Sequence, residues 1–145
     1  MSKAKVAVGC DHAGFDYKEE VKKMLTGLGY IVRDYGTHSK DSVDYPDFVH
    51  PVANSIEDKE NEVGILFCGS ANGVAITANK HQQIRAAIAW TDEVSSLSRQ
   101  HNDANILCLP ARYISLEDAK KFTLTFLTVT FEGGRHATRV NKIAL

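Results

Sequence analysis

The sequence has no excess of charge of either sign and no long hydrophobic run. Lysine and arginine together number 17 and aspartate and glutamate 18 in 145 residues, a formal net charge of −1. Balanced charge gives no bulk attraction to nucleic acid or to a membrane surface. There is no apolar run of the roughly 20 residues that a bilayer-spanning helix needs, and no secretory signal pattern. We therefore expect a cytoplasmic protein without nucleic-acid or membrane partners.

Cysteine is scarce, and the common cofactor motifs are missing. The three cysteines, Cys10, Cys68 and Cys108, are an odd number without metal-ligand spacing, which fits reduced thiols better than a disulfide framework. The sequence contains no G-x-G-x-x-G, no P-loop lysine motif and no G-x-S-x-G. Dinucleotide binding, nucleoside triphosphate binding and serine hydrolase chemistry are therefore not indicated.

What the sequence does have is a regular alternation of strand-like and helix-like segments. Strands are predicted at 5–10, 30–35, 63–68, 85–90 and 105–110, and helices at 15–26, 45–56, 74–80, 91–100, 115–132 and 135–144. This alternation predicts an α/β fold, a single domain over residues 1–145 with a parallel sheet covered by helices on both faces. Right-handed crossovers make it doubly wound, and by these rules alone we expect the flavodoxin-like strand order.

Residues 63–74 join a buried-type strand to a loop of small residues. The apolar run ends in Cys68, and the loop Gly69-Ser70-Ala71-Asn72-Gly73 leads into a short helix. Such a turn aims backbone N–H groups at an anion, and its glycines allow positive φ and close approach. The helix dipole is expected to lower the pKa of the Cys68 thiol, which would place a base or nucleophile beside an oxyanion hole. The alternative is a buried cysteine before an ordinary strand-to-helix turn.

Polar side chains also follow the other predicted strands. Asp11 and His12 follow the first strand and Arg112 the fifth, at the sheet edge where parallel α/β proteins bind ligands. The first two could be an acid/base pair or a phosphate-binding turn, or equally a capping aspartate and a surface histidine. His101 ends a helix that points away from this edge, so it fits the site only if a neighbouring subunit supplies it. A zinc site of Cys68, His12, His101 and Asp11 has no supporting ligand spacing, so we expect no metal.

Several longer motifs occur together in a fixed order. They are GCDHAG at 9–14, DYP at 44–46, GILFCGS at 64–70, ANK at 78–80, SRQHND at 98–103 and FEGGRH at 131–136. Over essentially the whole chain they resemble the ribose-5-phosphate isomerase B family, which includes the galactose-6-phosphate isomerase subunits.

This resemblance implies a three-layer α/β/α sandwich with five parallel strands in the order 2-1-3-5-4, which we adopt over the flavodoxin-like order. It implies an aldose–ketose isomerase that interconverts D-ribose 5-phosphate and D-ribulose 5-phosphate through an enediolate, without metal or organic cofactor. It further implies a homodimer, in some members a tetramer, with active sites at the subunit interface. The C-terminal helix 135–144 is then expected to pack on a partner subunit.

The resemblance also implies roles for individual residues. Cys68 would take the C2 proton, His101 with Asp11 would open the sugar ring, and Ser70 would help move protons between O1 and O2. The implied substrate-binding residues are His12, Tyr45, Gly69, Ala71, Asn72, Gly73, Asn102, Arg112, Arg135 and Arg139. Arg135 and Arg139 are four residues apart and share one helical face.

The loop combines features of two versions of this family. Cys68 is present and Val74 stands where the other version has a catalytic glutamate, which favours the cysteine version. The Asn72-Gly73 pair is nevertheless typical of the glutamate version, and Ser70 replaces a common threonine while keeping the hydroxyl. Two alternative functions stay open, an isomerase of a hexose 6-phosphate such as allose or galactose 6-phosphate, and a non-catalytic sugar-phosphate-binding module.

Overall fold

Five parallel strands form the centre of the molecule in a computed structural model that describes residues 3–145. The strands are β1 (Lys5–Cys10), β2 (Ile31–Asp34), β3 (Val63–Cys68), β4 (Ala86–Ile88) and β5 (Ile106–Pro110). They pair in the order β2-β1-β3-β5-β4, and each neighbouring pair is parallel. The order implied by the family resemblance is therefore confirmed, and the flavodoxin-like order is wrong. Burial explains the difference: β5 is buried throughout and lies inside the sheet, whereas the three partly exposed residues of β4 form its edge.

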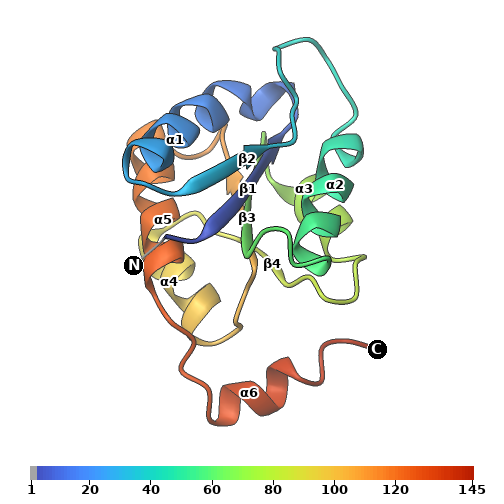
Figure 1. Cartoon of the computed structure of the whole chain (residues 1–145), viewed down its shortest axis with the longest axis vertical. Helices are drawn as coiled ribbons and strands as arrows, with labels where there is room; N and C mark the ends of the chain where they lie inside the picture. Colours follow the sequence, from blue (N-terminus) through green and yellow to red (C-terminus); the bar gives the residue numbers. More distant parts are fainter. Residues whose placement is uncertain (1–2) are drawn as a thin grey trace.

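Helices cover both faces of this sheet, which confirms the three-layer sandwich. They are α1 (Phe15–Gly27), α2 (Pro46–Glu57), α3 (Asn72–Ala78), α4 (Asp92–Gln100), α5 (Leu116–Thr128) and α6 (Arg135–Val140), with a short 3-10 helix at His12–Gly14. Figure 1 shows α1, α4 and α5 on one face and α2 and α3 on the other. Successive residues of a strand point to opposite faces, so Phe67 packs in the core under α1 and α5 and Leu66 in the core under α2. No helix within residues 3–145 has the length and apolar character to cross a membrane.

A buried lysine ties α1 to the edge strand β2. Lys18 is fully buried, and its Nζ donates to both carboxylate oxygens of Asp34, at 2.8 and 2.7 Å, and to the carbonyl of Thr37 at 2.8 Å. Burial raises the pKa of Asp34, but hydrogen bonds from Lys18, Lys22 and the Gly36 N–H outweigh it, so that the pKa lies below its usual value. These bonds anchor the start of the loop at 35–45, which leads to the site.

The C-terminal part of the chain differs most from the prediction. α5 ends at Thr128, because the β-branched residues around Val129 favour extended backbone, and residues 129–134 form a connection without helix or strand. α6 ends at Val140 rather than at 144, and the tail turns back until the N–H of Leu145 donates to Gln82 at 3.1 Å. In Figure 1, α6 lies at the end of the molecule opposite to the loop at 35–45.

Candidate active site

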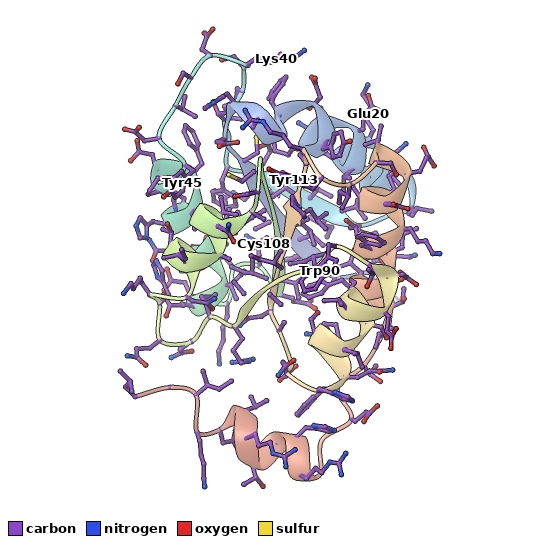
Figure 2. All side chains as sticks on the ribbon, turned by 180° about the vertical axis from the view of Figure 1, so that it is seen from behind. Glu20, Lys40, Tyr45, Trp90, Cys108 and Tyr113 are labelled. Carbon is purple, nitrogen blue, oxygen red and sulfur yellow. The ribbon has the colours of Figure 1, made fainter. Side chains whose placement is uncertain are left out.

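A cavity of about 280 Å³ opens at the carboxyl ends of β1, β3 and β5. Its lining residues are Asp11, His12, Ala13, Tyr45, Cys68, Gly69, Ser70, Gly73, Arg112 and Tyr113. In Figure 2, Tyr45 and Tyr113, which both line the cavity, lie in the half of the molecule nearer to Lys40. The structure thus brings together eight of the predicted site residues from four separate segments: after β1, before α2, after β3 and after β5.

Cys68 and Asp11 are in direct contact at this cavity. Sγ of Cys68 donates to Oδ2 of Asp11 at 3.2 Å. The other carboxylate oxygen, Oδ1, accepts from the N–H groups of Ala13 at 2.9 Å and Gly14 at 3.2 Å. Because Cys68 is 8% exposed and Asp11 is 6% exposed, both face the cavity through small openings. Asp11 therefore caps the turn after β1 and at the same time accepts a hydrogen bond from the thiol.

These surroundings disfavour the thiolate form of Cys68. Burial, and then the hydrogen bond to Asp11 and its negative charge, raise the pKa of the Cys68 thiol to about 11. The N–H groups of Gly69 and Ala71 act in the opposite direction, but more weakly. The expectation of a lowered pKa is therefore wrong for the free protein. The sequence places Asp11 57 residues away, and only the fold brings this carboxylate to the sulfur.

The loop after β3 shapes the cavity through close contacts. The residue of this loop with left-handed backbone conformation is Ala71, with φ of 68°. The two glycines, Gly69 and Gly73, instead allow other side chains to approach the backbone closely. A Cβ on Gly73 would lie 2.4 Å from Cζ of Tyr45, and one on Gly69 would lie 3.1 Å from a guanidinium nitrogen of Arg112. These contacts hold the Tyr45 ring and the Arg112 side chain against the loop. Asn72 begins α3 two residues earlier than predicted.

Ser70 and His12 are oriented by backbone N–H groups. The exposed Ser70 hydroxyl accepts from the N–H of Asn72 at 3.3 Å and keeps its own proton for donation. His12 Nδ1 accepts from the N–H of Val43 at 3.3 Å. A neutral His12 then carries its proton on Nε2, which makes that atom a hydrogen-bond donor. With the exposed Arg112, the cavity offers donors that suit an anionic ligand.

The other predicted residues lie outside this cavity. Ala71 and Asn72 belong to its loop but do not line it. Asn102 follows α4, next to His101, and Arg135 and Arg139 are on α6 at the opposite end of the molecule (Figure 1). His101 stacks on His136 of α6, at the end of the molecule opposite to the loop at 35–45, so the structure does not bring His101 to Cys68, Asp11 and His12 as the zinc quartet considered from the sequence would require.

His101 has two neighbours, His136 and Glu132, that were not among the predicted site residues. Its ring stacks on that of His136, and the carboxylate of Glu132 lies near both rings. Burial, His101 and Arg135 lower the pKa of His136, and Glu132 opposes them. Tyr113, directly after Arg112, also lines the cavity and was not among the predicted site residues. The sequence feature that could have indicated Tyr113 is its position in the loop after β5, a strand inside the sheet.

Comparisons with known proteins agree with this architecture. The profile of a family described as ribose/galactose isomerase matches residues 6–143. The chain is 42% identical to ribose-5-phosphate isomerase B from Escherichia coli K12, over 96% of this chain and 93% of that protein. A ribose 5-phosphate isomerase structure from Thermotoga maritima matches with a TM-score of 0.95 at 47% identity, over 97% of each chain. Ribose-5-phosphate isomerase B from Mycoplasma genitalium, solved with bound ribulose-5-phosphate, matches with a TM-score of 0.93 at 34% identity, over 99% of this chain and 95% of that one.

Proposed function

This chain belongs to the ribose/galactose isomerase family, and we propose that it interconverts D-ribose 5-phosphate and D-ribulose 5-phosphate. It is a sugar-phosphate aldose–ketose isomerase. The similarity to ribose-5-phosphate isomerases, one of them solved with ribulose-5-phosphate, supports the pentose phosphate as substrate.

The observation that carries the proposal is the contact between Cys68 and Asp11. A thiol that donates to a carboxylate at 3.2 Å has a proton acceptor in place. When Asp11 takes this proton, the thiolate can remove the C2 proton of the open-chain aldose. The electrons of that C–H bond form the C1–C2 double bond, and the negative charge moves to O1 of the enediolate. A proton then passes from O2 to O1, which leaves the negative charge on O2. As C2=O forms, the electrons of the C1–C2 double bond take a proton from the Cys68 thiol at C1, which gives the ketose and restores the thiolate.

The loop at 69–73 is proposed to stabilise the enediolate. The N–H groups of Gly69 and Ala71 favour negative charge at the sulfur, and an enediolate would lie next to the same loop. Removing one such donor typically costs about 3–4 kcal/mol of transition-state stabilisation. Ser70 has a free donor and is placed to move protons between O1 and O2.

Phosphate binding is proposed to come from both subunits of a homodimer. His12 and Arg112 line the cavity of one chain, beside Tyr45. The partner subunit would add Asn102, Arg135 and Arg139, since these residues cannot reach the cavity of their own chain. Arginine suits this role because its planar guanidinium can bind two phosphate oxygens at once.

Ring opening is proposed to depend on His101 of the partner subunit. Breaking the C1–O4 bond requires a proton at O4 and loss of the proton from the C1 hydroxyl, which a histidine can exchange in turn. In a homodimer with shared sites, α6 and the tail to residue 144 pack on the partner. No metal or organic cofactor enters this scheme, and we propose that the protein works in the cytoplasm.

A hexose 6-phosphate is the second candidate substrate. The family description names galactose as well as ribose, and cavity depth decides between a five-carbon and a six-carbon sugar phosphate. A non-catalytic binding module fits less well, because a cavity that only binds the sugar does not need the contact between Cys68 and Asp11.

The test is an assay of the purified protein with ribose 5-phosphate, allose 6-phosphate and galactose 6-phosphate, measuring ketose formation. We expect ribose 5-phosphate to react fastest and solvent deuterium to enter C2 of the recovered aldose. Cys68→Ala should fold normally and lose at least about 99% of both activities, since the variant lacks the base. Full exchange in this variant would contradict the assignment of Cys68, and no turnover of any of the three substrates by the unmodified protein would contradict the proposed function.

A further inference from the structure

A cluster of three side chains near α6 is not explained by the proposed chemistry. The rings of His101 and His136 stack with centroids 4.2 Å apart and planes at 10°. One carboxylate oxygen of Glu132 lies 3.8 Å from Nε2 of His101 and 3.6 Å from Nε2 of His136. Glu132 and His136 thus contact the residue to which ring opening is assigned, and so far have no role of their own.

The backbone holds this cluster in place. The N–H of Glu132 donates to the carbonyl of Gln100 at 3.0 Å, which ties the connection before α6 to the end of α4. The chain then turns through Gly133 and Gly134, whose φ values are 72° and 57°. Residues with a side chain rarely adopt these conformations, so the double glycine permits the turn that returns His136 to His101.

The two rings differ in exposure. The side chain of His136 is 12% exposed and that of His101 is 40% exposed. His136 therefore offers a fixed surface, while His101 keeps an accessible edge. Because the rings are nearly parallel, the in-plane lone pairs of their nitrogens run side by side instead of converging on one point. This geometry suits the orientation of His101 better than the chelation of a metal ion.

We propose that His136 and Glu132 are positioning residues for His101. The stack fixes the plane of the His101 ring. The negative charge of Glu132, 3.8 Å from Nε2 of His101, favours one orientation of that edge, so that the ring meets the sugar of the partner subunit in one orientation. The inference rests on the proposed role of His101 in ring opening. Its energetic basis is that a displacement of about 1 Å in a catalytic group can cost about 100-fold in rate.

Two activities separate positioning from a general structural role. Turnover of ribose 5-phosphate requires ring opening. Exchange of a C1 hydrogen of ribulose 5-phosphate with solvent deuterium does not, because this ketose has its O5 blocked by phosphate and is open-chain. His136→Leu is expected to lower turnover about tenfold and to leave exchange within about twofold, since the base and the enediolate site are intact. His136→Phe keeps an aromatic ring for stacking and should restore most of the turnover.

Glu132→Gln should show the same selective loss, because it keeps the shape of the side chain and removes its charge. The matched control is His50→Leu in the second histidine pair, where Nδ1 of His50 lies 2.7 Å from Nε2 of His81. It should change neither activity. Thermal unfolding and the dimer fraction of each variant are measured alongside.

Equal turnover in His136→Leu and His136→Phe, or equal loss of turnover and exchange in either, would overturn the positioning role. His101→Asn is assayed in parallel. If it shows the selective loss of turnover and His136→Leu does not, only the positioning role is wrong. If His101→Asn itself loses both activities equally, the ring-opening role of His101 is wrong, and the positioning role is wrong with it.

Discussion

Cys68 and Asp11 illustrate how one contact can both impede and enable a reaction. A carboxylate next to a thiol opposes the thiolate, because two negative charges repel each other in a partly buried site. The same carboxylate is the acceptor to which the thiol proton can pass. Asp11 is therefore expected to act in opposite directions on the reactivity of the free thiol and on turnover.

Asp11→Asn tests this expectation. The amide keeps an oxygen to cap the turn at Ala13 and Gly14, but it removes the charge and can donate to sulfur, so the pKa of Cys68 should fall from about 11. Alkylation of Cys68 by iodoacetamide at pH 8 should become at least about tenfold faster, while isomerase turnover drops about 100-fold.

The rate of alkylation is followed by mass spectrometry of the Cys68 peptide, with Cys108 as the internal control because it is fully buried. In the unmodified protein the rate should rise about tenfold per pH unit up to about pH 11, where the thiol ionises. A plateau below pH 9 would contradict the raised pKa.

Gly73 is expected to be required because of its contact with Tyr45. In Gly73→Ala the new Cβ would lie 2.4 Å from Cζ of Tyr45, so the ring must leave its place at the cavity. We expect KM for ribose 5-phosphate to rise about tenfold or more, since at least one substrate contact is lost. Gly27→Ala is the control because a Cβ there meets nothing within 4 Å, and its KM should stay unchanged. An unchanged KM in Gly73→Ala would show that the substrate does not need the Tyr45 ring.

At the scale of elements, the tie between α1 and β2 should carry a large part of the stability. Lys18→Met keeps much of the side-chain volume but leaves the largely buried Asp34 without its main partner. Breaking a buried ion pair in this way costs about 3–5 kcal/mol, and we expect the lower end because Lys22 still donates to Asp34 at 2.8 Å. The free energy of unfolding is measured with urea at pH 7.

The control and the pH dependence make this prediction specific. Lys23→Met breaks an exposed pair, 3.5 Å from Glu20, and should cost less than about 1 kcal/mol. Because the pKa of Asp34 is lowered on folding, the unfolded chain binds more protons near pH 4, and the stabilisation decreases as the pH falls. The difference in the free energy of unfolding between the unmodified protein and Lys18→Met should therefore shrink below about pH 4. A constant difference down to pH 2 would rule out this ion pair as its cause.

Periodicity and turn residues were enough to predict most elements, but not those set by distant parts of the chain. β1, β3 and α4 lie where the sequence places them, because apolar runs and a capping Thr91 are local features. The position of β5 between β3 and β4 depends on the packing of whole strands. α6 is shorter than its pattern because the tail turns back to Gln82.

The same distinction applies to the candidate site. Loops after parallel strands meet at one edge by geometry, so Asp11, Cys68 and Arg112 could be grouped from the sequence. The raised pKa of Cys68 and the stack of His136 on His101 depend on contacts across the fold, for which local spacing gives no indication.

At the scale of the whole molecule, the predicted site residues lie at two opposite ends. One end holds the cavity with Cys68, and the other carries α6 (Figure 1), where His101 stacks on His136. Within a single chain, the residues of the α6 end therefore cannot reach the cavity. In two chains related by a two-fold axis they can, because the cavity end of each then meets the α6 end of the other.

Mixed dimers of two variants test this arrangement directly. Cys68→Ala and Arg135→Ala chains are each purified, mixed, dissociated and allowed to re-associate, and turnover is measured at a low ribose 5-phosphate concentration where both parent dimers are nearly inactive. If Arg135 acts on the partner's cavity, each mixed dimer has one site with both defects and one intact site. Random pairing makes about half of the dimers mixed, so activity should recover to about a quarter of that of the unmodified protein. If Arg135 serves the cavity of its own chain, every site of a mixed dimer carries one defect, and activity stays at the level of the parents.

The control mixes Cys68→Ala with Asp11→Asn, two residues of the same cavity, and should recover nothing because each site then keeps one of the two defects.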